Sequence, residues 1–408
     1  MKILLFNITG KTGSTGKIVT ELRNYLLKNK HEVIVAHGVD QISDDGYYKI
    51  SKRVESALFR RLTYCGRAVY KGNPFSLMRI KKIIKVEKPD IVHLHCINGY
   101  CVNIYKLLSY LSFKKIRTVI THHAEFYYTG SCAYSFECDK YINNECYGCD
   151  NLMYATSNRF FADAHRNWIS MFNSVNNFRY KDLVFVAVSP WVCSRSLLSP
   201  IVNRYKCETV YNGVDINTFF YKNNVNIKYI RRLNLKEQKV VLYVSSSFSP
   251  QDKNSVKGGN FVCEIAKLMS NVKFVVVSSS IGKYEQLPSN LYIWGKVLSQ
   301  EELSQLYSLA NVTLLTSKRE TFSMVVAESL CCGTPVVGFE AGGPESIALS
   351  EYCCFVEYGN ISKLHDALVN MLNIRYDKTE VSKKSITMYS NEQMGKRYLD
   401  IYNSLLHG

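Results

Sequence analysis

The sequence predicts an α/β protein with two doubly wound domains, each built on a parallel sheet, that face a central cleft. The length of 408 residues corresponds to two domains at about 100–200 residues each. Short apolar runs bounded by turn residues, typical of buried parallel strands, alternate with helix-like stretches. Each half also opens with an apolar strand and a glycine-containing loop, and in open α/β sheets ligands bind beyond the carboxyl ends of the strands.

In the first half, the elements follow one another in β–α–β order. An apolar run at residues 3–6 precedes the glycine-rich loop 10–16, a stretch with helical spacing at 18–27, and a second apolar run at 31–36. This opening predicts parallel strands connected by helices. Further strands are expected at residues 91–95, 117–121 and 184–188. We assign residues 1–205 to the N-terminal domain.

The second half begins near residue 206, and Asn212-Gly213 gives a turn signal shortly afterwards. Strands are expected at residues 240–244, 273–277, 291–294, 312–315 and 335–338, with helices at 259–269 and 301–309. The same alternation of strand and helix predicts a second parallel sheet. We assign residues 206–390 to this C-terminal domain.

The chain is strongly basic, with 51 Lys and Arg against 34 Asp and Glu and a net charge of +17. This excess indicates an anionic partner such as nucleic acid, an anionic membrane surface or a phosphorylated substrate. We expect no nucleic acid, because the sequence holds no recognised nucleic-acid module. The N-terminal apolar run does not resemble a signal peptide, and no stretch reaches the ~20 apolar residues of a membrane span. We therefore expect a cytoplasmic protein whose membrane contact, where it exists, is peripheral.

The segment from Glu320 to Glu328 carries the strongest functional signal, two carboxylates that follow the apolar run 312–315. Helical character begins at Phe322, so residues 321–323 are expected to form a first helical turn whose free N–H groups bind an anion. Glu320 and Glu328 would then suit two ends of one ligand. The structural alternative is that Glu320 favours a helix N-terminus and Glu328 lies on a solvated face.

Four motifs in order resemble those of glycosyltransferase family 4, whose members are retaining enzymes with the two-domain GT-B fold. The matching segments are NGVD at 212–215, E-x7-E at 320–328, CCGTPVVG at 331–338 and GGPE at 342–345. The resemblance implies an acceptor-binding first domain and a nucleotide-sugar-binding second domain. It also implies that the last helix, residues 391–408, crosses back to the first domain.

The resemblance assigns individual residues of the second domain to the donor. Glu320 would contact the transferred sugar, and Glu328 would hold the ribose of the nucleotide. The donor-binding residues would be Lys257, Thr321, Phe322, Ser323 and Glu328, together with Gly13 of the first domain. The family usually pairs the lysine with an upstream arginine, but residues 244–248 (VSSSF) stand in its place here, and Lys253 has an unusual spacing. Without the resemblance, Lys257 would be interpreted as a solvated loop residue.

Two segments of the first domain also resemble family motifs. The loop around Gly13 is similar to the N-terminal glycine loop, where glycines let the backbone approach the diphosphate or the acceptor; the alternative is a turn into a helix. Residues 121–125 (THHAE) resemble a T-x-H-D segment of the subgroup that builds bacterial surface polysaccharides. In that comparison we take His122 as the motif histidine, which lines the sugar subsite, and His123 as the replacement for aspartate.

Four cysteines, Cys132, Cys138, Cys146 and Cys149, lie within 18 residues. The Cys-x2-Cys half suits tetrahedral zinc, whereas the other pair is loosely spaced. A structural zinc ion, packed free thiols and disulfides remain open, although a cytoplasmic setting disfavours disulfides. Similar cysteines follow the histidine motif in the surface-polysaccharide subgroup.

The basic stretch at residues 79–88 (RIKKIIKVEK) is amphipathic. One interpretation is a helix that packs its isoleucine face on the sheet and leaves its lysines in solvent. The other is a basic face toward anionic lipid, which would suit a lipid-linked acceptor.

We therefore predict transfer of a hexose-type sugar from a nucleotide-diphosphate sugar to a lipid-linked glycan in surface-polysaccharide assembly, such as O-antigen. His122 and Glu320 are the predicted catalytic residues. The chemistry requires no metal or other cofactor, because Lys257 and helix N-terminal amides would stabilise the leaving diphosphate. One alternative is a catalytically inactive sugar-nucleotide-binding homologue, given the absent arginine. The other is a sugar-nucleotide epimerase, for which the first domain lacks a clear set of acid/base carboxylates.

Overall fold

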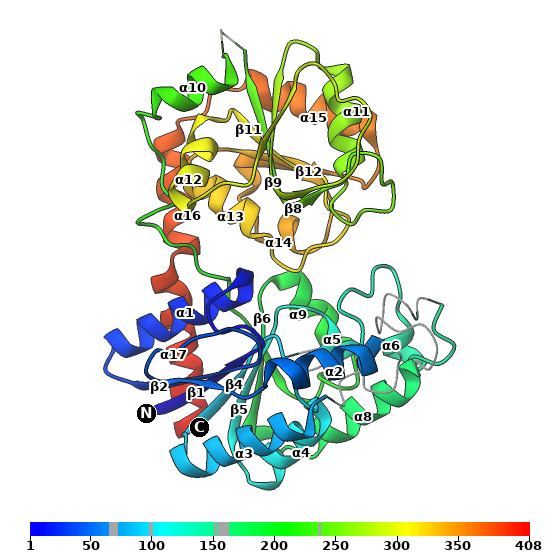
Figure 1. The fold of residues 1–408 in the computed structure, drawn as a ribbon, viewed down its shortest axis with the longest axis vertical. Helices are drawn as coiled ribbons and strands as arrows, with labels where there is room; N and C mark the ends of the chain where they lie inside the picture. Colours follow the sequence, from blue (N-terminus) through cyan, green and yellow to red (C-terminus); the bar gives the residue numbers. More distant parts are fainter. Residues whose placement is uncertain (65–71, 98–100, 151, 153–162, 236–237) are drawn as a thin grey trace. The chain divides into compact units, whose positions relative to one another are not determined.

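A computed structural model of the protein describes residues 1–64, 72–97, 101–150, 152, 163–235 and 238–408. The chain forms two compact units (Figure 1): Met1–Gly213 with Met394–Gly408, and Val214–Gln393. The first contains a seven-stranded sheet and the second a six-stranded sheet. The paired strands of both sheets run parallel throughout the described residues, and this confirms the predicted α/β class.

The first sheet has the strand order β3-β2-β1-β4-β5-β6-β7. Its strands are β1 Lys2–Asn7, β2 Glu32–His37, β3 Tyr47–Lys49, β4 Ile91–Leu94, β5 Arg117–His122, β6 Leu183–Ala187 and β7 Lys206–Thr209. The chain winds in one direction from β1 to β3 and in the other from β4 to β7. The crevice beyond β1 and β4 is therefore the topological switch point, where doubly wound sheets bind ligands.

Helices cover the first sheet and connect its strands. They are α1 Gly13–Lys28, α2 Arg53–Tyr64, α3 Pro74–Glu87, α4 Ile104–Phe113, α5 Phe126–Thr129, α6 Lys140–Asn143, α8 Ala164–Asn176, η1 Tyr180–Asp182, α9 Pro190–Leu197 and α17 Asn391–His407. Local sequence sets several of their starts. Asn73 caps α3 and Ser189 caps α9, and in both helices a proline follows at the first position, where its missing N–H has no helical partner to lose.

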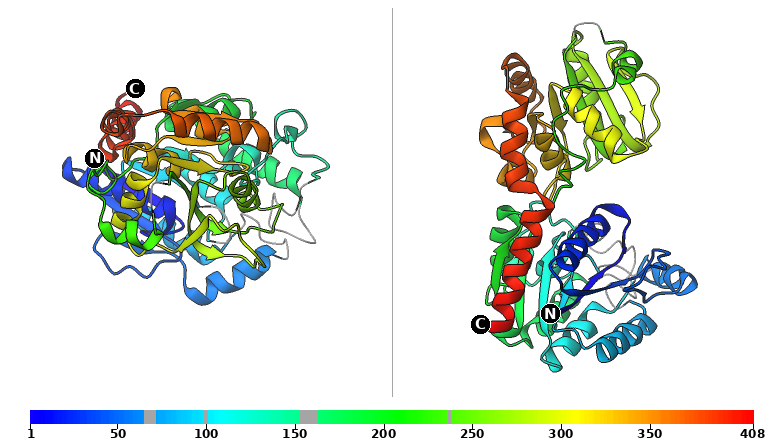
Figure 2. Two further views of the ribbon diagram at one scale, coloured as in Figure 1. Left: turned by 90° about the horizontal axis from the view of Figure 1, so that it is seen from above. Right: turned by 90° about the vertical axis from the view of Figure 1, so that its left-hand side faces the viewer.

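The C-terminal helix α17 is part of the core of the first unit. Tyr398, Ile401 and Tyr402 pack with Leu22 of α1 and Val119 of β5 in one buried cluster. Two of its tyrosines also bond to the sheet, since the Tyr402 hydroxyl lies 2.6 Å from Nδ1 of His93 and the Tyr398 hydroxyl 3.0 Å from Oγ1 of Thr121. Figure 2 shows α17 (red) running along this sheet.

The second sheet has the order β10-β9-β8-β11-β12-β13. Its strands are β8 Val240–Phe248, β9 Lys273–Ile281, β10 Leu291–Gly295, β11 Val312–Leu315, β12 Val336–Phe339 and β13 Cys353–Val356. Its helices are α10 Ile227–Leu233, α11 Gly259–Leu268, α12 Gln300–Leu309, α13 Met324–Cys331, α14 Gly343–Ile347, η2 Ser350–Tyr352, α15 Ile361–Asn373 and α16 Lys378–Tyr389. Numbered along the unit, the strands follow the order 3-2-1-4-5-6 of dinucleotide-binding domains, with the switch point between β8 and β11.

Candidate active site

The switch point of the second unit brings together two residues that lie far apart in sequence. Lys257 lies in the loop between β8 and α11, and Glu320 lies in the loop between β11, the neighbouring strand, and α13. The Lys257 ammonium Nζ lies 2.5 Å from Oε1 of Glu320, and both side chains keep part of their surface in solvent. A cation and a carboxylate therefore stand side by side where this fold binds nucleotides.

The loop that carries Lys257 is fixed against the end of β11. The hydroxyl of Thr316 donates to the carbonyl oxygens of Lys257 (3.0 Å) and Gly258 (2.9 Å). Gly258 has a φ of 65°, and a Cβ there would lie 2.2 Å from the carbonyl oxygen of Thr316. Only glycine fits this left-handed, closely packed position, which explains why a glycine follows the lysine.

Glu320 is held through its backbone by the GGPE loop. Its N–H donates to the carbonyl of Ala341 (3.0 Å), and its own carbonyl accepts from Gly343 (2.9 Å). Glu345 in turn accepts from the N–H groups of Ala341 (3.1 Å) and Gly342 (2.7 Å). The motif glutamate thus orders a loop that positions Glu320, a link that the sequence alone did not indicate.

Helix α13 begins later than the sequence predicted. Met324 is its first residue and Ser323 its N-cap, so residues 321–323 precede the helix instead of forming its first turn. Phe322 is buried, with its ring 6.5 Å from that of Tyr389; its side chain anchors the segment and leaves only its backbone for a ligand. Thr321 lies beside it, nearly buried.

Ser323 has a conformation that is unusual for a residue with a side chain. Its φ is 77° and its ψ 92°, a region that costs a residue other than glycine about 1–3 kcal/mol. Its hydroxyl is buried, and among the described residues it has no hydrogen-bond partner. A strained backbone and an unsatisfied hydroxyl at a helix N-terminus together favour a polar ligand at this position.

Glu328 lies on the second turn of α13, half-buried. Its Oε2 accepts a hydrogen bond of 3.3 Å from the hydroxyl of Tyr307, a buried residue of α12. Burial, together with the Glu328 charge, raises the pKa of Tyr307 well above its usual value, so this phenol remains a donor. Tyr307 therefore orients a carboxylate of which part stays accessible.

The position of the absent arginine is taken by serines at the end of β8. The Ser245 hydroxyl donates to the carbonyl of Ser247 (2.7 Å), and Ser246 between them is exposed. Lys253 lies exposed in the following loop. Lys257 is the cation that the structure pairs with Glu320.

In the first unit, the glycine loop surrounds an internal carboxylate. Oδ2 of Asp40 accepts from the N–H groups of Gly10, Lys11 and Thr12 at 2.9, 2.9 and 3.1 Å, and Oδ1 accepts from the Thr12 hydroxyl at 2.8 Å. Burial alone would raise the pKa of Asp40, but these hydrogen bonds outweigh it and hold the pKa below its usual value. Gly13 follows at the first position of α1, exposed and with a φ of 71°. Asp40, which the sequence did not indicate, therefore already uses these three loop amides.

His122 is buried in the interior of the first unit. Its ring stacks on Phe185 at 5.1 Å, and neither ring nitrogen has a hydrogen-bond partner in the described parts of the chain. Burial lowers its pKa to about 3, so the ring is neutral at physiological pH. As placed, His122 has no exposed surface with which to contact a sugar.

His123 is the first residue beyond the carboxyl end of β5. Its Nε2 lies 3.0 Å from Nδ1 of His95, which follows β4. Counted from Thr121, a T-x-H pattern places its histidine at 123, so His123 is a second candidate for the motif histidine beside His122. His123 thus lies beyond β5, near the switch point of the first sheet.

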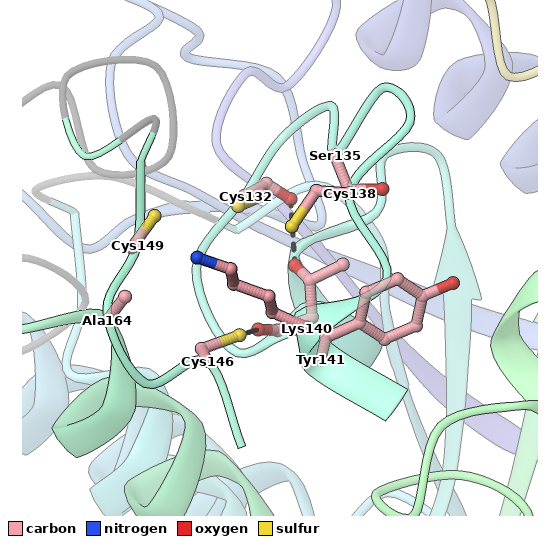
Figure 3. Close-up of a pocket in the computed structure, with 9 residues that line it drawn as sticks. Cys132, Ser135, Cys138, Lys140, Tyr141, Cys146, Cys149 and Ala164 are labelled. Atoms are coloured by element: carbon pink, nitrogen blue, oxygen red, sulfur yellow. Dashed lines mark hydrogen bonds between the residues drawn. The ribbon is translucent and has the colours of Figure 1, made fainter. Parts of the chain in front are cut away.

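The four clustered cysteines gather around one small cavity of the first unit (Figure 3). The cavity has a volume of about 10 Å³, and its lining includes Cys132, Cys138, Cys146 and Cys149. Burial raises the pKa of Cys132, and the charges of the other three thiols raise it further. None of the four forms a disulfide bond. As the side chains stand, the described residues contain no group of three or more His, Cys, Asp or Glu that could hold a metal ion.

Comparisons with known proteins match nearly the whole chain. Residues 15–218 match the family model described as "Glycosyltransferase Family 4", and residues 238–373 match "Glycosyl transferases group 1". A curated protein of Bacillus anthracis, N-acetyl-alpha-D-glucosaminyl L-malate synthase, is 22% identical over 97% of this chain and 94% of its own length.

Solved structures share the fold at low sequence identity. Sucrose-phosphate synthase from Thermosynechococcus elongatus matches with a TM-score of 0.69 and 16% identity, covering 99% of this chain and 98% of the other. Anabaena Alr3699/HepE in complex with UDP-glucose matches with a TM-score of 0.67 and 15% identity, covering 99% of this chain and 100% of the other. These matches confirm the predicted GT-B fold.

Proposed function

This chain belongs to glycosyltransferase family 4, and on that premise we propose that it transfers a hexose-type sugar from a nucleotide-diphosphate sugar to a glycan acceptor. The observation that carries the proposal is the Lys257–Glu320 pair at the switch point of the second unit. There a lysine can bind the diphosphate, while the neighbouring carboxylate contacts the sugar. Glu328, further along α13, binds the ribose hydroxyls, and Ser323 and the amides at the start of α13 bind phosphate oxygens.

The proposed reaction is governed by charge. The bond between the anomeric carbon and the diphosphate oxygen breaks, and negative charge grows on the leaving group. The Lys257 ammonium and the α13 amides stabilise that charge, which explains how the step proceeds without a metal ion. The acceptor hydroxyl attacks on the face from which the diphosphate leaves, so the configuration is retained, and a departing phosphate oxygen takes its proton. Glu320, released from Lys257 by the diphosphate, stabilises positive charge on the sugar.

We propose UDP as the nucleotide, because HepE of Anabaena was solved with UDP-glucose on the same fold. For the first unit we assign the sugar contact to His123 in place of His122, since His123 lies beyond the end of β5.

A lipid-linked glycan of surface-polysaccharide assembly is the acceptor that the motif at 121–125 favours. The Bacillus anthracis relative favours a second candidate, a small hydroxy acid such as malate. A panel of both acceptor classes with one donor distinguishes them by product mass.

A thermal-shift screen of nucleotides and nucleotide-sugars tests the donor site. A ligand at 100 times its Kd adds about 2.7 kcal/mol to the free energy of unfolding, so UDP or a UDP-sugar is expected to raise the melting temperature of the wild type. Glu328→Ala is expected to remove most of this shift, because the ribose loses its carboxylate partner. Glu285→Ala, an exposed glutamate in a loop of the same unit, serves as the control and should keep it. No shift with any nucleotide would contradict the proposed donor site.

We further propose that α2 and α3 contact an anionic membrane. No helix in the described parts of the chain is long and apolar enough to span a bilayer. However, Val54, Leu58 and Leu62 form an exposed apolar stripe at every fourth position of α2, and Phe75 and Met78 are exposed on α3. The two helices are joined where both guanidinium nitrogens of Arg79 bond to Glu55 at 2.7 Å.

The charge around this stripe complements anionic lipid. Exposed cations on the two helices are Arg53, Arg61, Lys82 and Lys85. Both carboxylates are ion-paired, Glu55 with Arg79 and Glu87 with Lys2. Each cation near an anionic surface adds about 1 kcal/mol of attraction, and the apolar stripe can insert at the interface. A lipid-linked acceptor would then be presented at the same surface.

Vesicle co-sedimentation tests this surface. The protein is expected to sediment with phosphatidylglycerol vesicles but not with phosphatidylcholine vesicles, and added salt should weaken the binding. Leu58→Asp should reduce the bound fraction several-fold, because it places a charge in the apolar stripe. Leu298→Asp makes the same change at a leucine that is 93% exposed in the second unit, and it should bind like the wild type. Equal loss in both variants would argue against α2 as the contact.

A further inference from the structure

The thiols of Cys132, Cys138, Cys146 and Cys149, all in the loop region after β5, surround one very small cavity. The cavity of about 10 Å³ is at the lower limit that a single water molecule needs. Figure 3 shows the cysteines on different sides of this space, with the Lys140 ammonium among them. Four cysteines of one loop that line a single small cavity are typical of a structural metal site.

We propose that Cys132, Cys138, Cys146 and Cys149 bind one structural zinc ion. Four thiolates satisfy the tetrahedral coordination of Zn²⁺ with no open position, so the ion stabilises the loop and takes no part in the chemistry. In the structure the thiols are not yet arranged around a common point. Rotation about one Cα–Cβ bond carries each sulfur to another staggered position, and the shared cavity gives the sulfurs a common space to turn into.

The backbone of the loop supports a tightly held site. Glu145, Cys146 and Gly148 all have a positive φ, at 44°, 59° and 56°. This compact turn spans the Cys-x2-Cys half of the site. A strained backbone persists only where the surrounding structure holds it in place. Outside α6 this loop has little secondary structure that could hold these residues. Two cysteines of the turn bound to one ion would supply the constraint.

The charge of the site is balanced by its neighbour. Binding releases one proton from each thiol, so four Cys–SH groups and Zn²⁺ give a tetrathiolate complex of net charge −2 and four protons. The ammonium of Lys140 lies among the cysteines and also bonds to Oδ2 of Asp150 at 2.7 Å. A cation at this position offsets part of the negative charge of the complex.

The ion would also order residues next to His123, the proposed sugar contact of the first unit. Ser135, which lines the same cavity, donates to Oε2 of Glu125, and Nη2 of Arg195 donates to the Ser135 hydroxyl at 2.7 Å. Glu125 is fully buried and lies two residues after His123. Zinc would therefore hold the loop that orders the segment beyond β5, a structural role consistent with a reaction that needs no metal.

Metal analysis of the full-length chain, purified without a polyhistidine tag, tests the site. Atomic emission is expected to find about one zinc per chain. Cys138→Ser and Cys149→Ser should each lose most of it. Cys263→Ser, which changes a cysteine of α11 in the second unit, should retain it. Loss of zinc in this control as well would mean adventitious binding and would overturn the proposal.

Cobalt substitution keeps the test independent of variants that fail to fold. The wild-type chain, stripped of metal under reducing conditions and given Co²⁺, should develop the sulfur-to-cobalt charge-transfer and d–d bands of a tetrahedral thiolate complex. It should bind one equivalent, and Zn²⁺ should displace it. The proposal would be refuted if the chain bound neither Co²⁺ nor Zn²⁺ while all four cysteines still reacted with a thiol reagent. Neither result depends on the donor or the acceptor.

Discussion

Replacing Glu320 by glutamine is expected to lower kcat for sugar transfer by at least about 100-fold, within the ~10²–10³ range for removal of one preorganised electrostatic contact. Glutamine keeps the size of the side chain and its hydrogen bond to Lys257 but removes the charge that stabilises the sugar as the diphosphate leaves. Nucleotide binding, which we assign to Lys257 and Glu328, should change little. Initial rates with a UDP-sugar, together with the UDP thermal shift, measure both effects.

Glu340→Gln is the matched control for this change. Glu340 is exposed and follows β12 directly, and its N–H bonds to the carbonyl of Val356 through the backbone alone. Its rate should therefore equal that of the wild type. Glutamine keeps a hydrogen bond to Lys257 in this partly accessible pair, so Glu320→Gln should also melt near the wild-type temperature. A kcat within a few-fold of wild type would mean that Glu320 only pairs with Lys257 and does not act on the sugar.

The regular elements could be predicted from the sequence because they depend on local pattern. Apolar runs such as residues 240–244 and 312–315 become β8 and β11, since a strand buried on both faces needs apolar residues throughout. The order of the strands could not be read this way. Lys257 and Glu320 are 63 residues apart, and only the neighbouring positions of β8 and β11 bring them together.

Several details of the two sites depend on local structure that the sequence pattern does not show. His122 and His123 are adjacent in sequence, but His122 ends β5 with a fully buried ring, whereas His123 is the first residue beyond the strand and lies 3.0 Å from His95. The start of α13 was set too early because Phe322 is apolar, although it serves as a buried anchor before the helix. Asp40 lies 30 residues from Gly10, so its bond to the loop amide gives no local signal.

Gly343→Ala is expected to destabilise the second unit by about 3 kcal/mol and to abolish sugar transfer. A Cβ at this position would lie 2.3 Å from the carbonyl oxygen of Thr321 and 2.7 Å from the backbone nitrogen of Phe322. Both contacts are with backbone, which cannot rotate away, so the loops must separate, and forced overpacking of this kind is costly. The separation would break the bond from Gly343 to Glu320 and move the carboxylate from Lys257. Chemical denaturation and initial rates measure the two effects.

Gly359→Ala separates this steric effect from the general cost of removing a glycine. Gly359 has a φ of 84° and open space around its Cβ position, so alanine there costs only the left-handed conformation, about 1–2 kcal/mol, and the enzyme should stay active. At Gly343, by contrast, alanine would lower stability because its Cβ enters the close packing between two loops. If both variants lost stability equally and kept their activity, the contact between the GGPE loop and residues 320–322 would not be what positions Glu320.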